Sequence, residues 1–413
     1  MRRHIPESEG WHSQDGRTPQ RKELLNRRAF IRWGVTVAAG APFILTSASS
    51  LALAAEAETK APSPRHRPDA KVAIISCHSY GPEVRAALQQ SFDLIGGIDS
   101  LVKNKTVTVK INLTGTNFTP FLDRPVGETF MTHYATALAL ASLLFDAGAK
   151  RVRFVESTQS KAELEQTLVF AEWDMRALTA LGKVEFENTR NLGRGKTYSH
   201  LKVPGGGNLF SSFDLNHAYE ETDVMISLTK LKNHVTTGVT LSMKNCFGLT
   251  PNSLYGDQAG SEEATGGRTP LHNPRGYEAI KLPGLKEDAT STDPFYRVPA
   301  IITDLCAARP IHLAIIDGIT SMTGAEGPWC GPAAEMKFIA PGVLIVGLNP
   351  VSTDAVSTAV MGYANPRAKR GTKPFTHCDN HLVMAEQAGL GTADLSQIEV
   401  RGMTIEKACC PFG

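Results

Sequence analysis

Short apolar runs rich in β-branched residues alternate with helical patterns along most of this chain, and no other feature constrains the fold as much. Strands are predicted at 71–76, 106–111, 151–155, 223–228, 311–316 and 343–346, and helices at 82–95, from about 130 to 147, and from Pro350 onward. Runs that are apolar throughout are typical of strands buried on both faces. The pattern predicts an α/β fold with a mixed or largely parallel sheet flanked by helices, with two lobes as an alternative.

One segment, residues 251–294, interrupts this alternation. It is rich in Gly, Pro, Asn, Thr and charged residues and shows little periodicity. A loop of this length inside a compact domain is either functional or disordered. Because it follows the most motif-like part of the chain directly, we expect a lid or insertion over a site, and disorder is the alternative.

The densest group of chemically useful side chains begins where the strand at 223–228 ends. It comprises Lys230, Lys232, Asn233 and His234, followed by Lys244 and Asn245 on a helix-like segment that ends at Gly248. In such sheets, functional groups gather at the carboxyl ends of the strands. Lys232 and Lys244 can converge on an anion, a desolvated lysine can act as base or nucleophile, and His234 can be a base or a metal ligand. The alternative is that these residues are solvated loop charges.

Three carboxylates form a second group at predicted strand and helix ends. Asp317 follows a buried strand, Glu326 lies in a Gly-rich loop, and Asp354 lies in the first turn of a predicted helix. Such carboxylates can bind a hard cation or serve as acid and base. A tight turn at Asp317 and stabilisation of a helix N-terminus by Asp354 are the structural alternatives.

A third group, His377 and His381, has the i, i+4 spacing that places two side chains on one face of a helix. If this segment is helical, the pair could hold a transition metal. No Glu follows His377, so the zinc-protease pattern is absent. Surface or capping roles are the favoured interpretation, and the metal bound, if any, stays unknown.

The N-terminal segment indicates export. Arg27-Arg28 precedes an uncharged, moderately apolar stretch over residues 34–53, and small-residue cleavage patterns follow at 52–54 and 55–57. This arrangement predicts a twin-arginine signal over 1–57, a flexible leader over 58–70 and an α/β domain over 71–413. The expected partner is the twin-arginine translocation machinery, and the expected location is periplasmic or extracellular, without stable membrane insertion after cleavage. An N-terminal membrane anchor is the alternative.

Removal of this signal would change the charge of the chain. Residues 1–57 hold eight Lys/Arg and five Asp/Glu, so 35 basic and 36 acidic residues remain in the other 356 residues. The apparent basicity is therefore mostly targeting signal, and no nucleic-acid-binding surface is expected. The seven cysteines are too sparse for a disulfide scaffold, and their odd number predicts at least one free, buried or ligating thiol.

Several motifs together resemble the proteins grouped as domain of unknown function 362. The central block reads Lys230-x-Lys232-x-His234, Gly238-x-Thr240 and Lys244-Asn245-x-x-Gly248, and the others are Lys110-x-Asn112, Thr132-His133, Val155-Glu156, Asp317-Gly318, Glu326-Gly327-Pro328 and Asn349-Pro350 with Asp354. The likeness extends from about Lys71 to Gly362. It implies that Lys110 and Asn112 join the site at a strand end. Asn349 departs from the family pattern, where an Asp is usual.

Some members of that family carry a ferredoxin-like segment, but this chain lacks the Cys-x-x-Cys-x-x-Cys run that a cluster needs. The chain also shows a weak likeness to lactate racemase, an enzyme with a tethered nickel pincer cofactor. Asp123-Arg124-Pro125 is similar to a loop of that enzyme, and His234, Gly238 and Lys244 are similar to another stretch. This likeness implies a shared architecture more than a shared reaction. The identity of any cofactor stays unknown.

Together these features predict a polar pocket at the strand ends that binds an anionic small molecule or cofactor and catalyses a reaction on it. The residues expected to bind the ligand are Lys110, Asn112, Lys230, Lys232, Asn245 and Asp317, and those expected to be catalytic are His234, Lys244 and Glu326. A non-catalytic binding protein for a metal or an organic anion is the alternative.

Overall fold

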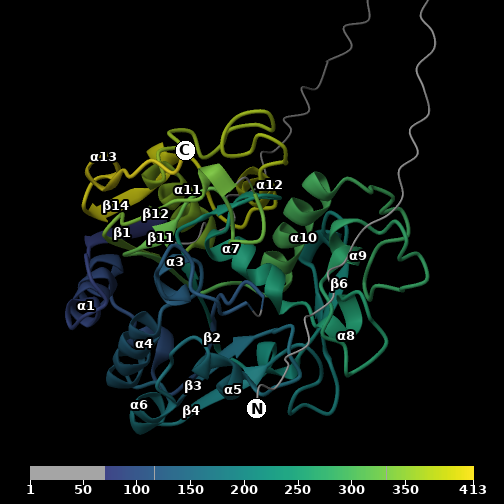
Figure 1. Cartoon of the computed structure of the whole chain (residues 1–413), viewed down its shortest axis with the longest axis horizontal. Coiled ribbons are helices and arrows are strands. Elements are labelled where there is room, and N and C mark those ends of the chain that lie inside the picture. Colours follow the sequence, from purple (N-terminus) through teal and green to yellow (C-terminus); the bar gives the residue numbers. More distant parts are fainter. Residues whose placement is uncertain (1–69, 116, 332) are drawn as a thin grey trace, which may run out of the picture. The chain divides into compact units, whose positions relative to one another are not determined.

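The computed structural model describes residues 70–115, 117–331 and 333–413, which all lie in one compact unit and not in two lobes (Figure 1). The predicted signal at 1–57 and the leader up to residue 69 lie outside the described residues, so both stay predictions. None of the helices in the described ranges is long and apolar enough to cross a membrane.

An eight-stranded sheet with the order β14-β1-β13-β10-β7-β2-β3-β4 forms the centre of this unit. Its strands are β1 (Lys71–Ser76), β2 (Thr106–Lys110), β3 (Arg151–Glu156), β4 (Val184–Asn188), β7 (Val224–Lys230), β10 (Leu313–Gly318), β13 (Val343–Gly347) and β14 (Glu399–Gly402). From β10 to β4 all neighbours are parallel, whereas β13 is antiparallel to both β10 and β1. The predicted α/β fold with a mixed, mostly parallel sheet is confirmed.

Helices cover both faces of this sheet (Figure 1). The longer ones are α1 (Glu83–Ile95), α4 (Tyr134–Asp146), α10 (Pro294–Ala308) and α11 (Pro350–Val360); the shorter ones are α2 (Asp99–Val102), α3 (Val126–Thr129), α5 (Leu164–Val169), α6 (Met175–Ala180), α7 (Leu241–Asn245), α8 (Asn252–Tyr255), α9 (Thr269–His272), α12 (His381–Gln387) and α13 (Ile405–Ala408). Helices α1, α4, α5 and α6 contribute to one hydrophobic core, and α7, α10, α11 and α12 contribute to the other. Alternate strand residues feed the two cores, so Met225 and Ile226 of β7 lie in different ones.

Three small antiparallel pairs lie outside the main sheet. They are β5 (Ser199–Lys202) with β6 (Ser212–Leu215), β8 (Asn233–His234) with β9 (Gly238–Val239), and β11 (Ser321–Met322) with β12 (Phe338–Ile339). The second of these pairs connects β7 to α7, so the central motif block folds as a strand, a hairpin and a short helix in succession.

Two helix starts show how local capping sets the boundaries. The helix predicted from about residue 130 begins instead at Tyr134, because the His133 side chain caps it by accepting the N–H of Ala135. At α11, the Asn349 side chain accepts the N–H of Ser352 and so caps the helix predicted near Pro350. Asn349 therefore has a structural role that needs no charge.

Residues 251–294 form the short helices α8 and α9 within otherwise irregular backbone. Two of their side chains, Tyr255 and Leu271, are fully buried in the core that also holds α7 and α10. This segment is therefore an insertion anchored by apolar contacts.

Candidate functional site

The carboxyl ends of β2 and β3 carry the best-connected polar group of the site, the pair Lys110 and Glu156. The Lys110 ammonium lies 2.6 Å from a Glu156 carboxylate oxygen, and both side chains are almost fully buried. Nζ also donates to the Ile111 carbonyl at 2.7 Å and to the Asn245 amide oxygen at 3.2 Å. All three ammonium protons of Lys110 therefore have protein acceptors.

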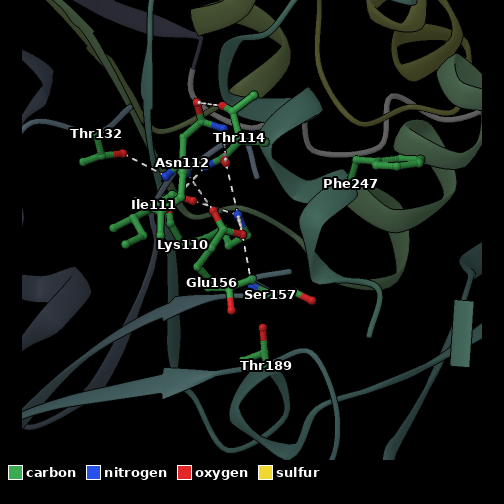
Figure 2. A network of polar contacts seen from close by, with 12 residues as sticks. Lys110, Ile111, Asn112, Thr114, Thr132, Glu156, Ser157, Thr189 and Phe247 are labelled. Carbon is green, nitrogen blue, oxygen red and sulfur yellow. Dashed lines mark hydrogen bonds and ion pairs between the residues drawn. The ribbon is translucent and has the colours of Figure 1, made fainter. Parts of the chain in front are cut away.

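Asn245 on α7 completes this network at the strand ends, part of which Figure 2 shows. Its amide oxygen also accepts from Nδ2 of Asn112 at 3.2 Å, and its own Nδ2 donates to the Lys110 carbonyl and the Ser227 hydroxyl. A side chain at Gly248 would come within 2.9 Å of Lys110 Nζ. Gly248 is thus favoured at this position, because the backbone passes directly over the ion pair and leaves little room for a side chain.

Helix α7 is held in place from α11 by Asp354. The Asp354 carboxylate accepts the N–H groups of Ser242 and Met243 at 2.9 and 2.8 Å, and the Ser242 hydroxyl at 2.6 Å. Burial raises the pKa of Asp354 to about 7, although these hydrogen bonds oppose the rise. Asp354 therefore stabilises the N-terminus of a neighbouring helix, the one that presents Lys244, and not that of its own helix.

A cavity lies above this network. Its inner part has a volume of about 100 Å³ and its outer part about 630 Å³. The residues that line both parts are Thr114, Gly115, His234, Lys244, Phe247, Arg268 and Glu326. The inner part ends on Lys110, Asn112, Glu156 and Asn245, and the outer part is also lined by His272 and Trp329.

Lys244 stands out among the charged residues of the cavity because its charged group has neither an ion-pair nor a hydrogen-bond partner among the described residues. Its Nζ lies 4.8 Å from the centre of the Phe247 ring. Burial lowers the pKa of Lys244 to about 8; Glu326 opposes this shift, and Arg268 and Lys110 add to it. Lys244 is thus a partly buried cation at a cavity wall, ready for an anion or able to lose its proton.

Arg268 comes to the same cavity from the insertion. Its Nε donates to the Thr250 carbonyl at 2.8 Å, and Nη2 donates to the Ser157 hydroxyl at 2.6 Å and to the Asn252 amide oxygen at 3.3 Å. Its Nη1 makes no hydrogen bond to any residue in the described ranges. The guanidinium is therefore fixed in orientation on one side and keeps donors for a ligand on the other.

Two histidines line the cavity with opposite tautomers. Nδ1 of His234 accepts the N–H of Thr236 at 3.0 Å, so in the neutral ring the proton is on Nε2. Nδ1 of His272 lies 2.9 Å from the Arg268 carbonyl, which can only accept, so in His272 the lone pair is on Nε2. Burial lowers the pKa of both rings below the ordinary value, which keeps them neutral. The His234 ring can therefore donate a hydrogen bond from Nε2, and the His272 ring can accept a proton at Nε2.

Glu326 is the acidic residue that faces this arrangement. Its Oε1 lies 3.7 Å from His234 Nε2, and its Oε2 accepts the N–H of Val235 at 3.0 Å. Burial opposes ionisation of the Glu326 carboxyl, but His234, the Val235 N–H and Lys244 outweigh it and hold the pKa below its ordinary value. Glu326 is therefore a carboxylate that offsets part of the positive charge of the cavity.

Lys230 and Asp317 lie apart from the cavity, in a separate buried cluster at the ends of β7 and β10. Lys230 Nζ lies 3.3 Å from the Asp317 carboxylate and donates to the Thr320 carbonyl and the Tyr80 hydroxyl. Asp317 also accepts from the hydroxyls of Tyr80 and Thr136, both at 3.0 Å. The structure therefore places these two predicted ligand-binding residues in a self-contained ion pair that does not line the cavity.

Lys232 lies just behind the cavity wall. Its Nζ donates to the Thr114 hydroxyl at 2.7 Å, the Phe130 carbonyl at 2.6 Å and the Glu326 carbonyl at 2.8 Å. Burial lowers its pKa to about 7. The three contacts join the loops that carry Thr114 and Glu326, and they leave no ammonium proton for a ligand, so Lys232 does not converge with Lys244 on one anion.

The possible metal ligands are not brought together. Helix α12 starts at His381, which is buried, whereas His377 precedes the helix and is exposed, so the two do not share a helical face. No group of three or more His, Cys, Asp or Glu within the described ranges could hold a metal ion. All seven cysteines, which lie in these ranges, are free thiols.

Three charged or titratable residues of the cavity were not predicted as site residues from the sequence: Glu156, Arg268 and His272. Glu156 directly follows a predicted strand, Lys110 lies at the end of another, and the two strands pair in parallel in the structure. Its position at the carboxyl end of a strand could therefore have identified Glu156 as a site residue. Arg268 and His272 lie in the aperiodic insertion, where no pattern in a single sequence distinguishes them from surface residues.

The chain belongs to the family described as domain of unknown function (DUF362), whose model matches residues 107–359. The matched region runs from β2 to α11 and contains every cavity residue discussed above. The chain is also similar to a thylakoid-associated protein of Synechocystis sp., with 24% identity over 322 residues that cover 74% of this chain and 84% of that protein. The resemblance inferred from the motifs is thus confirmed.

Proposed function

We propose that this member of the DUF362 family is an exported protein that binds a small organic anion in the cavity between Lys244 and Arg268 and catalyses proton transfer on it. The observation that carries the proposal is the ammonium of Lys244, which has no ion-pair or hydrogen-bond partner in the part of the chain that the structure describes. A partly buried charge without a partner is unfavourable, and a bound carboxylate or phosphate would relieve this cost.

The charges around the cavity favour an anion. Lys110 and Glu156 neutralise each other in a direct ion pair. The remaining charged residues are Lys244 and Arg268 against Glu326, and both histidines are neutral. One positive charge is therefore in excess, which suits a singly charged anion, and the outer volume of about 630 Å³ is in the range of small-molecule sites.

The tautomers of the two histidines support an acid–base role. His234 offers a hydrogen bond from Nε2 to an oxygen of the ligand. His272 offers a lone pair at Nε2. A proton could thus leave the ligand for His272 and return from the same ring, while the hydrogen bond from His234 stabilises negative charge that develops on the oxygen.

Ligand binding by the purified protein without residues 1–57 tests the first part. Calorimetric titration with acetate, lactate, pyruvate, succinate and inorganic phosphate should detect binding of at least one anion. Lys244→Met should weaken that binding by about tenfold or more, as expected for loss of a charge-assisted hydrogen bond. Lys202→Met, which removes an exposed lysine of β5, is the matched control and should leave binding unchanged. If none of these anions binds, or if Lys244→Met binds like the parent protein, the proposal is wrong.

Catalysis is tested separately by solvent deuterium exchange into the bound anion. Exchange at the carbon next to the carboxylate, or in pyruvate at the methyl carbon next to the ketone, would support an enzyme if it is lost in His272→Gln while the affinity is kept. Binding without exchange for every anion that binds would leave a non-catalytic organic-anion binding protein.

Export is proposed from Arg27-Arg28. A cell that carries the full chain should yield protein cleaved near residue 57 in its periplasm. Replacement of both arginines by lysine should retain the full-length chain in the cytoplasm, since the twin-arginine pathway requires this pair. Equal export of both forms would contradict the proposal.

A further inference from the structure

Lys244 has a second chemical capacity besides charge, which the other buried lysines of the site lack. A nucleophilic lysine needs a free electron pair on Nζ and open space in front of it. Lys110, Lys230 and Lys232 each give all three ammonium protons to protein acceptors. Lys244 alone among these four lacks such acceptors and lines both parts of the cavity.

We propose that Lys244 forms an imine with a 2-oxo acid whose carboxylate is held by Arg268. This inference rests on the proposed function, because it requires that the cavity bind an organic anion, and it names the class of that anion. The lowered pKa of Lys244, about 8, supports it, since a larger share of the amine is neutral near pH 7 than in an ordinary lysine.

The choice of a 2-oxo acid follows from what lies beside Lys244. Arg268 offers donors at Nη1 to a carboxylate, and its other nitrogens are fixed by Thr250 and Ser157. In a 2-oxo acid the carbonyl carbon is bonded directly to the carboxylate, so a carboxylate on Arg268 brings the carbonyl to the neighbouring amine. A simple aldehyde or ketone would leave the guanidinium unpaired.

The reaction needs no oxidant or reductant. The neutral amine of Lys244 attacks the carbonyl carbon, a C–N bond forms, and the π electrons of the C=O bond move to the oxygen, which takes up a proton. The nitrogen then loses a proton, and the new hydroxyl leaves as water after a second protonation. The nitrogen lone pair closes the C=N bond. His272, with its lone pair on Nε2, is placed to take the proton from nitrogen and to return it from its imidazolium form to oxygen, and the other proton that the oxygen takes up comes from solvent. His234 donates a hydrogen bond from Nε2 to that oxygen.

Reductive trapping tests this step directly. The protein without residues 1–57 is incubated with pyruvate or glyoxylate and sodium cyanoborohydride, and the adduct is located by intact-mass and peptide mass spectrometry. We expect one adduct at Lys244, formed at least about tenfold faster than at the exposed Lys202, because the carbonyl is bound next to the amine. Lactate, which has no carbonyl group, should give no adduct.

Two variants separate the roles of the residues. Lys244→Arg keeps the positive charge and should still bind pyruvate but give no adduct in the cavity. Arg268→Met should slow trapping of pyruvate by about tenfold or more, as expected for loss of a charge-assisted pair, and should slow trapping of acetaldehyde at Lys244 much less, only through the higher pKa of the amine. Circular dichroism spectra that match the parent protein show that both variants are folded.

The outcomes also separate this inference from the proposed function. If pyruvate binds through Lys244 but no adduct forms there, the imine is wrong and anion binding stands. If Lys244 is modified no faster than Lys202, or if Arg268→Met slows pyruvate and acetaldehyde equally, the inference is overturned. If no anion binds at all, both proposals fail.

Discussion

The motif block between β7 and α7 places lysines in two different environments. Lys230 is fully buried, paired with Asp317 and hydrogen-bonded to Thr320 and Tyr80, whereas Lys244 lines a cavity without an ion pair or hydrogen bond among the described residues. The same residue type therefore serves as part of the scaffold in one place and as an available cation in the other. What distinguishes the two is whether the protein itself provides acceptors for the ammonium protons.

This difference has an energetic consequence. A buried ion pair adds little net stability when both partners are present, but loss of one partner leaves an uncompensated buried charge and costs about 3–5 kcal/mol. Removal of a cation that has no partner costs the fold little and should affect only ligand binding. Replacement of Lys230 should thus lower the free energy of unfolding, whereas replacement of Lys244 should lower the affinity for the ligand.

The largest expected effect is on stability, in Lys230→Met. The variant leaves the carboxylate of Asp317 buried without its cation, so the free energy of unfolding measured with urea should fall by about 3–5 kcal/mol. The double variant Lys230→Met/Asp317→Asn, which removes both charges, should recover much of this loss. Arg85→Met is the control, because the Arg85–Asp146 ion pair is half-exposed and should contribute less than about 1 kcal/mol. Similar losses of unfolding free energy in Lys230→Met and Arg85→Met would contradict a structural role specific to the buried Lys230–Asp317 pair.

The next effect is on ligand affinity, in Lys244→Met. The dissociation constant of the anion that binds should rise by about 10- to 100-fold, which corresponds to one charge-assisted hydrogen bond. The free energy of unfolding should change by less than about 1 kcal/mol, because no described residue loses an ion pair or hydrogen bond. Calorimetry and urea unfolding check the two quantities on the same sample. A variant that unfolds as easily as Lys230→Met would show that Lys244 belongs to the scaffold too.

A smaller effect should come from pH. The pKa of Lys244 in the folded protein is about 8, below the ordinary value of 10.5, so its charge is lost as the pH rises through 8. Anion affinity should therefore fall by about tenfold between pH 7 and 9, and this fall should be absent in Lys244→Arg. The contribution to stability has the opposite sign: between about pH 8 and 10.5 the unfolded chain binds the proton more tightly, so folding becomes more favourable as the pH rises. An affinity that is constant across this range would contradict the assignment.

The smallest effect is expected in Glu326→Gln. The change removes a negative charge from the cavity while the amide oxygen can still accept the N–H of Val235. Anion affinity should increase by about two- to fivefold, a size typical of a partly screened charge. Titration calorimetry at low and high salt measures it, and the gain should shrink as salt is added. A loss of affinity would show that Glu326 contacts the ligand through a proton.

Sequence patterns were sufficient for the sheet, because strands such as β7 and β10 are continuous apolar runs with sharp polar ends. The family resemblance implied that Lys110 and Asn112 join the site, and the structure places both of them with Asn245 at the inner end of the cavity. Sequence patterns could not separate Lys230, Lys232 and Asp317 from the cavity, because residues at strand ends point in different directions and a sequence does not show which protons find protein acceptors. Arg268 and His272 could not be predicted as site residues, because the sequence of an aperiodic segment does not indicate where its side chains point.

The cavity has two parts that are held in different ways. Its floor of Lys110, Glu156 and Asn245 is fixed by strands β2 and β3 and helix α7, while Arg268 and His272 lie on an insertion that is tied to the core through Tyr255 and Leu271. If the cavity binds the proposed anion, new residues between those two anchors would change what is recognised without disturbing the strands.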